Sequence, residues 1–325
     1  MNDAAQGLLH AVVLDGEGGC RPADASEIQK WTCDDGILWA HLLLGDQGAR
    51  RWLRESAGLD DVVTDTLLAP DVRPRVRLTD RGLLIVLRGV NLNPGEDPED
   101  MVAVRVWIEP RRIISIRRRR LLSVQDVLHS LERGHGPTTP GAFIAELVEY
   151  LANRIGMFVD SIEENIGDAE ELMETADTLR TSQHLSALRR KIASVRRFLS
   201  PQRDALDRLY RQPGPLFTVE EIDYLREEAD RITRYIEDLD LARERAVVLR
   251  EEYLGRMAQE QNSRMYVLSV VAAVFLPLTF VTGMLGMNVG GLPGVNSAWG
   301  FAGSVVVMIG VTVSLIAYFR SKKWL

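Results

Sequence analysis

Two uninterrupted apolar runs near the C-terminus dominate the hydrophobic pattern of the chain. Residues 265–285 and 299–319 contain no charged side chain. As helices with a rise of about 1.5 Å per residue, each run covers roughly 31 Å, which is the thickness of the hydrocarbon core of a bilayer. Both runs are apolar on every face, unlike the one-sided pattern of a helix in a soluble protein. The pattern predicts two transmembrane helices joined by a link at 286–298.

Ahead of the first run, the hydrophobic spacing predicts one long helix. Apolar residues recur every three to four positions from residue 222 through Met257, and no proline occurs between 216 and 276. The simplest interpretation is a helix that starts near Thr218 and continues into the first span, roughly 100 Å in all. Its part at 218–264 would form a stalk. Because a heptad-like seam needs partners, we expect oligomerisation through this stalk.

Residues 8–117 follow a third pattern, in which short β-rich runs alternate with turn-forming residues. A helical stretch is expected at 46–68, and a loop at 91–100, where glycine, proline and aspartate gather. The six β-rich runs lie at 8–14, 37–44, 75–79, 83–90, 101–108 and 112–117. This order predicts an α/β domain with a mixed sheet over residues 1–139, and hence an α+β membrane protein as a whole.

From Pro140 onward the pattern is helical, and charge divides it into two halves. Residues 141–177 carry ten acidic side chains against one arginine, whereas 178–211 carry nine basic side chains against two aspartates. Helices of opposite charge attract each other, so we expect an antiparallel helical hairpin over 140–217. Another role for the acidic helix is to concentrate cations near the mouth of a pore.

Basic residues beside both apolar runs predict the orientation in the membrane. The link at 286–298 carries no charge, and the positive-inside rule places the basic ends in the cytoplasm. The flanking residues are Arg256, Arg264, Arg320, Lys322 and Lys323. We expect a multi-pass protein of the cytoplasmic (inner) membrane, with both termini inside, an external link and a cytoplasmic tail at 320–325.

Composition narrows the classes of partner and activity. The chain has a net charge of −7, and residues 265–325 contribute +3, which leaves −10 for residues 1–264. Such acidity argues against a nucleic-acid partner, because phosphate binding requires an excess of Lys and Arg. Cys20 and Cys33 form no CxxC pair, and five scattered histidines suggest no metal constellation. Without a phosphate loop or nucleophile elbow, an enzyme is not expected.

One face of the first span is suited to lining a pore. Two helices cannot enclose a channel, so a conduction path would lie on the symmetry axis of an oligomer. The stripe consists of Asn262, Met265, Leu268, Ala272, Leu276, Thr279 and Gly283. Packing against the second span is the alternative role for it. Pro277 removes a backbone hydrogen bond, which favours a neighbouring helix or water beside this span. No Asp, Glu, His, Lys or Arg lies in either span, so a carboxylate proton relay inside the membrane is not expected.

The link after the first span begins with Gly286, Met287 and Asn288. Its glycines permit a tight turn. In a ring of subunits, repeated Asn288 carboxamides and nearby carbonyls would present neutral oxygens to a cation. Neutral oxygens suit a hydrated hard ion, so we expect an outer filter at these three residues.

The long stalk helix, the two C-terminal spans and the Gly-Met-Asn sequence resemble the CorA superfamily of divalent-cation channels and transporters over essentially the whole chain. The link LGMNVGGLPG, the segment RPRVRLTDRGLLIVLRGVNLNPGEDPEDMVAVRVWIEPRRIISIRRR and the ending KKWL are most similar to the ZntB-like zinc transporter branch. CorA magnesium channels typically carry tyrosine before Gly-Met-Asn and an aromatic-acidic link after it. Here Leu285 and an uncharged VGG stand in those places.

This resemblance implies a homopentamer with a cytoplasmic funnel of α/β domains and a pore lined by the first span of each subunit. By position, Asn288 lies at the outer filter, the stripe named above lines the lumen, and Glu251 lies near an acidic regulatory cation site of magnesium channels. The implied partners are other copies of the chain, membrane lipid and the transported ion. That ion is Zn²⁺, with Mg²⁺, Co²⁺, Ni²⁺ and Cd²⁺ as alternatives, and no cofactor is implied.

Zinc uptake coupled to a proton gradient is also implied, with coupling residues to be sought at Glu251, Glu252, Glu260 or the acidic helix. Within the same class, the alternative is a CorA-like Mg²⁺/Co²⁺ channel. The alternative of another class is a membrane-anchored coiled-coil scaffold that conducts nothing.

Overall fold

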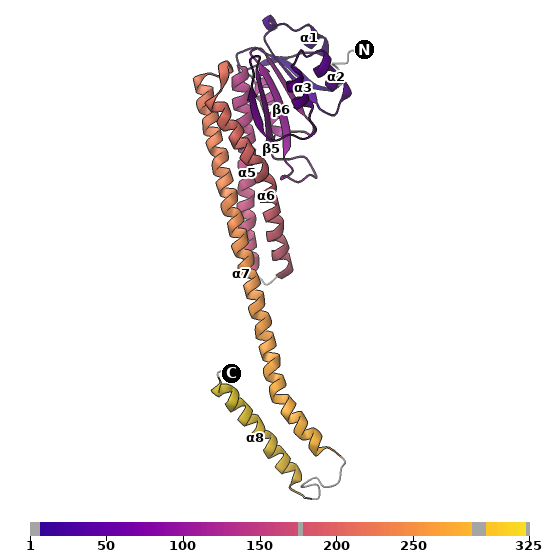
Figure 1. Ribbon diagram of the computed structural model, residues 1–325, viewed down its shortest axis with the longest axis vertical. Coiled ribbons are helices and arrows are strands. Elements are labelled where there is room, and N and C mark those ends of the chain that lie inside the picture. The colour runs from indigo at the N-terminus through magenta and orange to yellow at the C-terminus, as the bar shows by residue number, and fades with distance from the viewer. Residues whose placement is uncertain (1–6, 175–177, 288–296, 323–325) are drawn as a thin grey trace. The chain divides into compact units, whose positions relative to one another are not determined.

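The computed structural model describes residues 7–174, 178–287 and 297–322, without the side chains of 173–181. Contacts divide the chain into two compact units, Met1–Arg250 and Glu251–Leu325. The first unit holds a sheet with helices on it, and the second holds the end of the longest helix together with the C-terminal helix (Figure 1). The finer boundaries expected from the sequence remain a prediction.

A seven-stranded mixed sheet forms the centre of the first unit. Its order is β2-β1-β3-β7-β6-β5-β4, and among the described strands only the β3–β7 pair is parallel. The strands are β1 (Leu8–Leu14), β2 (Cys20–Pro22), β3 (Ile37–Leu43), β4 (Arg75–Leu78), β5 (Leu83–Gly89), β6 (Val102–Glu109) and β7 (Arg112–Arg117). The mixed sheet and the β-rich runs predicted for it are confirmed. The short β2 is not among those runs, because three residues are too few to show alternation.

Three short helices cover one face of the sheet. They are α1 (Ala25–Lys30), α2 (Gln47–Glu55) and α3 (Asp61–Leu68), with the 3₁₀ turn η2 (Cys33–Asp35) between α1 and β3. Leu67 of α3 is buried with Leu38 and Trp107 of the sheet. The helical stretch expected at 46–68 consists of two helices, because Gly58 between them adopts a φ of +64°, which no α-helix can include.

Four further helices lie on the other side of the sheet. They are α4 (Leu122–Glu132), α5 (Pro140–Glu174), α6 (Thr178–Arg211) and the first part of α7 (Val219–Leu285), which follows the 3₁₀ turn η3 (Gly214–Leu216). Of these, α5 and α6 contact the strands of the sheet. Phe143 of α5 packs edge-to-face on Trp39 of β3, with ring centroids 4.7 Å apart. At Gly89 a Cβ would lie 2.6 Å from a methyl of Leu151. The absence of a side chain there lets α5 approach the sheet closely.

α7 is one continuous helix of 67 residues, which confirms the predicted stalk helix. Its periodic apolar side chains, however, are buried within the chain itself. The buried positions that share one core with α5 and α6 are Leu225, Ala229, Ile232, Ile236, Leu239, Ala242, Ala246 and Leu249. The inference that this seam requires partner chains is therefore wrong over these positions, because the helical hairpin already covers it.

α5 and α6 form the predicted hairpin, but apolar packing joins them rather than charge (Figure 1). Two ion pairs of the described residues run from these helices to α7. Glu170 of α5 lies 2.8 Å from Arg245 of α7, and Arg196 of α6 lies 2.7 Å from Asp240 of α7. These pairs are partly exposed, so each contributes about 1 kcal/mol or less to stability. The acidic and basic helices are thus both neutralised in part by α7.

Two histidines face each other across β1 and β3. His10 pairs in register with His41, and their stacked rings have centroids 4.8 Å apart. His41 is 1% exposed, and its Nδ1 lies 2.7 Å from the Ser115 hydroxyl of β7. Burial, and then the positive charge of Arg117, lower the pKa of His10 to about 4. Burial, His10 and Arg117 together hold the pKa of His41 well below its usual value.

These histidines predict acid sensitivity of the first unit. Their pKa values in the folded state lie below the ordinary value near 6.5, so between about pH 6.5 and 4 the unfolded chain binds more protons. Stability is therefore complete above pH 6.5 and falls as the pH drops, by up to about 1.4 kcal/mol per pH unit for each histidine. Denaturant unfolding of a soluble fragment spanning residues 1–250 at several pH values measures this slope.

The His10→Gln variant measures how much one of the two histidines contributes to the pH dependence of stability. We expect it to reduce the slope between about pH 6.5 and 4 by up to 1.4 kcal/mol per pH unit. The matched control is His135→Gln, because His135 is exposed to solvent. An unchanged slope in His10→Gln would show that the buried pair does not set the acid sensitivity.

Candidate cation path along α7

The stripe expected to line a pore is uncovered in the single chain. All seven of its members are exposed: Asn262, Met265, Leu268, Ala272, Leu276, Thr279 and Gly283. Leu268 and Leu276 are 70% and 69% exposed. Large apolar side chains left bare to this degree require a bilayer or another chain. α7 and α8 (Gly300–Ser321) are both long and apolar enough to span a membrane, and no residue in the most apolar window of either is buried.

A different face of α7 is partly covered inside the second unit. Its half-buried residues are Val270, Ala273, Val274, Pro277, Leu278 and Val281. At about 100° per residue, this face lies roughly opposite the exposed stripe. α8 is the other helix of this unit and carries a matching half-buried row that includes Val305, Met308 and Leu315. Packing against the second span therefore uses the row at 270–281, and leaves the stripe free.

Two hydroxyl groups near the end of α7 donate hydrogen bonds to the helix backbone. Thr279 donates its hydroxyl hydrogen to the Phe275 carbonyl at 2.8 Å, and Thr282 donates to the Thr279 carbonyl at 3.0 Å. The lone pairs of Thr279 Oγ1 thus remain available to an ion or its water shell. This oxygen is neutral and suits a hydrated cation, which needs passing acceptors rather than a tight charged site.

α7 ends in a capped turn. The Gly286 N–H donates to the Thr282 carbonyl at 2.9 Å, after the last residue of α7. A Cβ at Gly283 would meet no atom within 4 Å, so the helix surface there is open. Met287 is 51% exposed. Asn288, the residue expected at the outer filter, lies outside the described residues.

Acidic residues occur only on the part of α7 that precedes the apolar run. Glu252 pairs with Arg256 at 2.7 Å, and Glu260 lies 3.6 Å from Arg264. Glu251 is exposed, and no ion pair joins it to another residue of the described ranges. Over those same ranges, no three His, Cys, Asp or Glu side chains gather to hold a metal. A site at Glu251 would thus need ligands from other copies of the chain.

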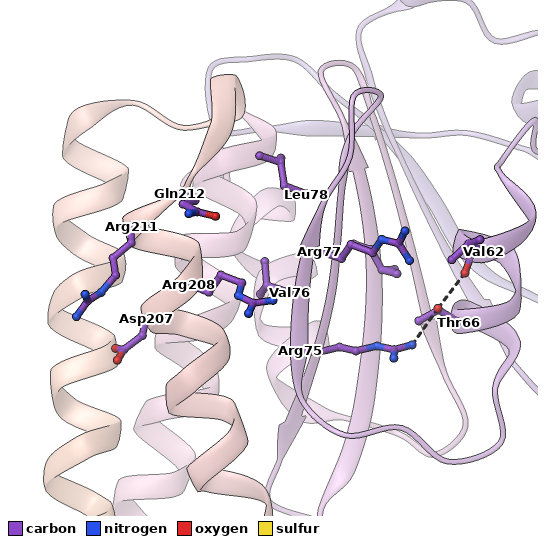
Figure 2. Close-up of a pocket in the computed structure, with 11 residues that line it drawn as sticks. Val62, Thr66, Arg75, Val76, Arg77, Leu78, Asp207, Arg208, Arg211 and Gln212 are labelled. Atoms are coloured by element: carbon purple, nitrogen blue, oxygen red, sulfur yellow. Dashed lines mark hydrogen bonds between the residues drawn. The ribbon is translucent and has the colours of Figure 1, made fainter.

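A cavity of about 840 Å³ lies in the first unit, between α3, β4 and the end of α6. Figure 2 shows residues that line it. The Thr66 hydroxyl accepts a hydrogen bond from Arg75 at 2.9 Å and donates to the Val62 carbonyl. Four arginines line this cavity, against the single carboxylate of Asp207. The excess positive charge repels cations, so this cavity is not part of a cation path.

Sequence reasoning did not identify which face of α7 packs toward α8 and which face stays exposed. The row that packs toward α8 contains Val270, Val274 and Leu278 at four-residue spacing. That spacing is visible in the sequence, but every face of the run is apolar, so spacing alone does not separate packing from exposed positions. The signal that distinguishes the stripe is its smaller and more polar members, Asn262, Thr279 and Gly283.

Cysteine labelling tests which face of α7 meets water. The chain has two cysteines, Cys20 and Cys33, and neither forms a disulfide. With both replaced by serine, Leu276→Cys in liposomes should react with a charged thiol reagent at least about tenfold faster than Leu278→Cys, because water reaches only the pore face. Mass spectrometry of the protein measures both rates. Equal labelling of the two positions would contradict the assignment.

Comparison with known proteins places these features in a family. The family described as CorA-like Mg²⁺ transporter protein matches residues 34–323. The divalent cation transporter CmaX of Pseudomonas aeruginosa is 41% identical over 323 residues, covering 98% of this chain and 97% of that protein. The zinc transport protein ZntB of Pectobacterium carotovorum is 34% identical over 320 residues, covering 98% and 96%.

Solved structures agree over the same length. The structure of full-length CmaX matches with a TM-score of 0.87 and 40% identity over 98% of each chain. The complete CorA magnesium transporter of Methanocaldococcus jannaschii matches with a TM-score of 0.81 at 17% identity, over 98% of this chain and 99% of that one, and so shows a shared fold. The sheet, the long helix and the two apolar C-terminal helices are common features of one family. This chain is a member of the CorA-like Mg²⁺ transporter protein family.

Proposed function

We propose that this protein moves divalent cations across the cytoplasmic membrane as a homopentamer, with Zn²⁺ as the main cargo, through a pore lined by α7. The observation that carries the proposal is the uncharged stripe on α7, which is exposed and lies opposite the face toward α8. Two spans per chain cannot enclose a path, so several copies must surround an axis. Five copies is the number that the CorA resemblance implies.

Zinc is preferred over magnesium for two reasons. Relatives that match 98% of this chain carry names referring to divalent cations and to zinc. In addition, Leu285 precedes Gly286 where CorA magnesium channels typically have tyrosine, and the link 286–298 carries no charge. A CorA-like Mg²⁺/Co²⁺ channel is the alternative within the same class.

The ion would meet neutral groups along the membrane-spanning part of the path. Thr279 offers a hydroxyl oxygen whose hydrogen is already donated to the helix backbone. We assign the outer filter to Asn288, with Gly286 and Met287 beside it. The lumen below the filter is lined by Met265, Leu268, Ala272, Leu276 and Gly283. Asn262 lies at the inner end of the lumen. The basic residues that flank the two spans favour an orientation with both termini in the cytoplasm.

Proton coupling, if it operates, must use groups outside the spans. The apolar runs contain no Asp, Glu, His, Lys or Arg. Of the three glutamates between residues 251 and 260, just before the first apolar run, Glu252 and Glu260 have an arginine one turn away. Glu251 has no such partner among the described residues and is the proposed coupling or regulatory group.

Metal uptake into liposomes made with the purified full chain tests the function directly. Zn²⁺, Mg²⁺ and Co²⁺ are offered separately, each with and without an inward proton gradient. We expect saturable Zn²⁺ uptake that exceeds Mg²⁺ uptake, and a fall of at least about tenfold in Asn288→Ala, because the filter loses its carboxamide ring. Ser297→Ala in the same link is the matched control.

Three outcomes would overturn parts of the proposal. Saturable Mg²⁺ uptake without Zn²⁺ uptake would favour the magnesium channel. If pure protein passes no metal under any gradient, a non-conducting membrane scaffold explains the fold better. If the proton gradient stimulates uptake equally in wild type and Glu251→Gln, Glu251 is not the coupling group.

A further inference from the structure

An arginine-rich cavity of about 470 Å³ lies in the first unit, where β5, β6 and α6 come together. It is separate from the cavity in Figure 2, and it has no part in the proposed cation path. Five arginines line it: Arg88, Arg105, Arg118, Arg119 and Arg197. The carboxylates on its lining are those of Asp71 and Asp100. The local charge is therefore strongly positive within an otherwise acidic soluble region.

Arg105 of β6 is the central group of this cavity. Its side chain is only 2% exposed, and its single hydrogen bond within the described residues runs from Nη2 to the Ala69 carbonyl at 2.7 Å. Its Nε and Nη1 have no partner there. Burial, and then the charge of Arg88, lower the pKa of Arg105 to about 10, which still leaves it charged at neutral pH. A buried guanidinium with two free donor groups is costly unless an acceptor binds to it.

The two carboxylates of the lining are already engaged by other arginines. Asp71 accepts from Arg88 at 2.7 Å, and Asp100 accepts from Arg119 at 2.6 Å. Arg88 also donates to the backbone carbonyls of Val72 and Met101, so its own donors are well used. Internal acceptors thus neutralise Arg88 and Arg119, and not Arg105.

Two further arginines at this cavity add uncompensated charge. Arg118 and Arg197 are exposed, and within the described part of the chain neither makes a hydrogen bond or an ion pair. The Arg197 guanidinium lies over the Phe198 ring, 4.6 Å from its centroid, which holds it against α6. Together with Arg105, three guanidinium groups are left to meet an acceptor from outside the chain.

We infer that this cavity binds the phosphate group of a small soluble anion, with Arg105 as the buried anchor and Arg118 and Arg197 at the mouth. Guanidinium groups bind phosphate oxygens through paired N–H donors, and three of them match a group that carries about two negative charges. The volume exceeds that of one free phosphate, so a phosphate ester such as a nucleotide fits better. A bound phosphate would join β6 to α6 and so tie the sheet to the helical hairpin.

Binding to the full-length protein in detergent tests this site without any transport measurement. Inorganic phosphate, pyrophosphate, ATP and sulfate are titrated separately by calorimetry, with EDTA present so that metal chelation has no effect. We expect phosphate compounds to bind, with pyrophosphate or ATP at least about tenfold tighter than inorganic phosphate, because more oxygens reach the arginines. At concentrations near 100 times Kd, the unfolding temperature should rise on the order of 5 °C.

Matched variants measure the contribution of the buried Arg105 to binding separately from that of the exposed Arg118 and Arg197. Arg105→Met keeps the apolar stem and should weaken binding at least about 30-fold, because it removes the buried charge. The double variant Arg118→Gln, Arg197→Gln alters only exposed side chains, so it should fold normally and weaken binding about tenfold. Arg54→Gln, an exposed arginine on α2, is the control and should bind as wild type.

Each result decides the inference. It is overturned if wild type binds none of the phosphate compounds up to about 10 mM, a concentration that corresponds to a very weak complex. It is also overturned if the Arg118/Arg197 double variant binds as tightly as wild type. Equal affinity for sulfate and inorganic phosphate, with no gain for pyrophosphate or ATP, would contradict a site for phosphate esters.

Discussion

Leu276→Lys is expected to abolish cation uptake while leaving the protein assembled. In the proposed pore, this substitution places a ring of positive charges around the path. At roughly 6 Å and an effective dielectric constant of about 20, one unit charge raises the energy of a divalent cation by about 5 kcal/mol. A difference of about 1.4 kcal/mol changes a rate tenfold, so uptake should fall at least about 100-fold. The measurement is initial Zn²⁺ uptake into liposomes at about pH 6, where the lysines stay charged.

Leu276→Met is the matched control, because it changes the shape of the side chain without adding charge. It should retain most of the uptake of wild type. Size-exclusion chromatography of both variants checks that the oligomer persists. If Leu276→Lys assembles normally and still conducts as wild type, the exposed stripe of α7 does not line the path, and another surface must carry the ion.

Trp39→Ala is expected to destabilise the first unit by about 3–5 kcal/mol, the range found when a large aromatic residue is removed from a packed core. Trp39 is 0% exposed in β3. Its indole N–H donates to the Ser115 hydroxyl at 2.7 Å, and its ring packs on both Phe143 and His10. The substitution removes contacts between the sheet and α5 and leaves Ser115 without its donor. Denaturant unfolding of the soluble fragment spanning residues 1–250 measures the loss.

Val62→Ala is the control for this experiment. Val62 is 52% exposed, so truncation there should change the free energy of unfolding by less than about 0.5 kcal/mol. A loss below about 1 kcal/mol in Trp39→Ala would mean that the surrounding core closes over the cavity, and that the Trp39–Phe143 contact does not hold the sheet to α5.

The features that the sequence predicts well depend on neighbouring residues alone. A run of 21 uncharged, mostly apolar residues predicts a span by length and composition, and the alternation in runs such as 83–90 needs no knowledge of distant contacts. The unbroken course of α7 up to residue 276 likewise follows from the lack of proline between 216 and 276, and the helix then continues through Pro277 to Leu285. The period of the hydrophobic pattern and the length of each run are enough to predict these elements, and the structure contains them.

The features that the sequence does not reveal depend on which surfaces meet. The seam at 225–249 shows that something packs on α7, but spacing does not say whether the partner belongs to the same chain. The hairpin charges predict attraction, yet Glu170 and Arg196 both find partners on α7. Arg105 is one of many arginines in the sequence, and only the fold shows that it is buried with free donors. The proposed outer filter rests on the sequence, because Asn288 lies outside the described residues.

The helical course of α7 within the second unit also fixes the phase between two of its faces. The row toward α8 and the exposed stripe alternate along the same segment, from Leu268 to Val281. Inserting a single residue in this segment would turn everything beyond it by about 100°, so that stripe members on the two sides of the insertion would no longer share a face. Evolution of this segment is therefore constrained in length more than in composition.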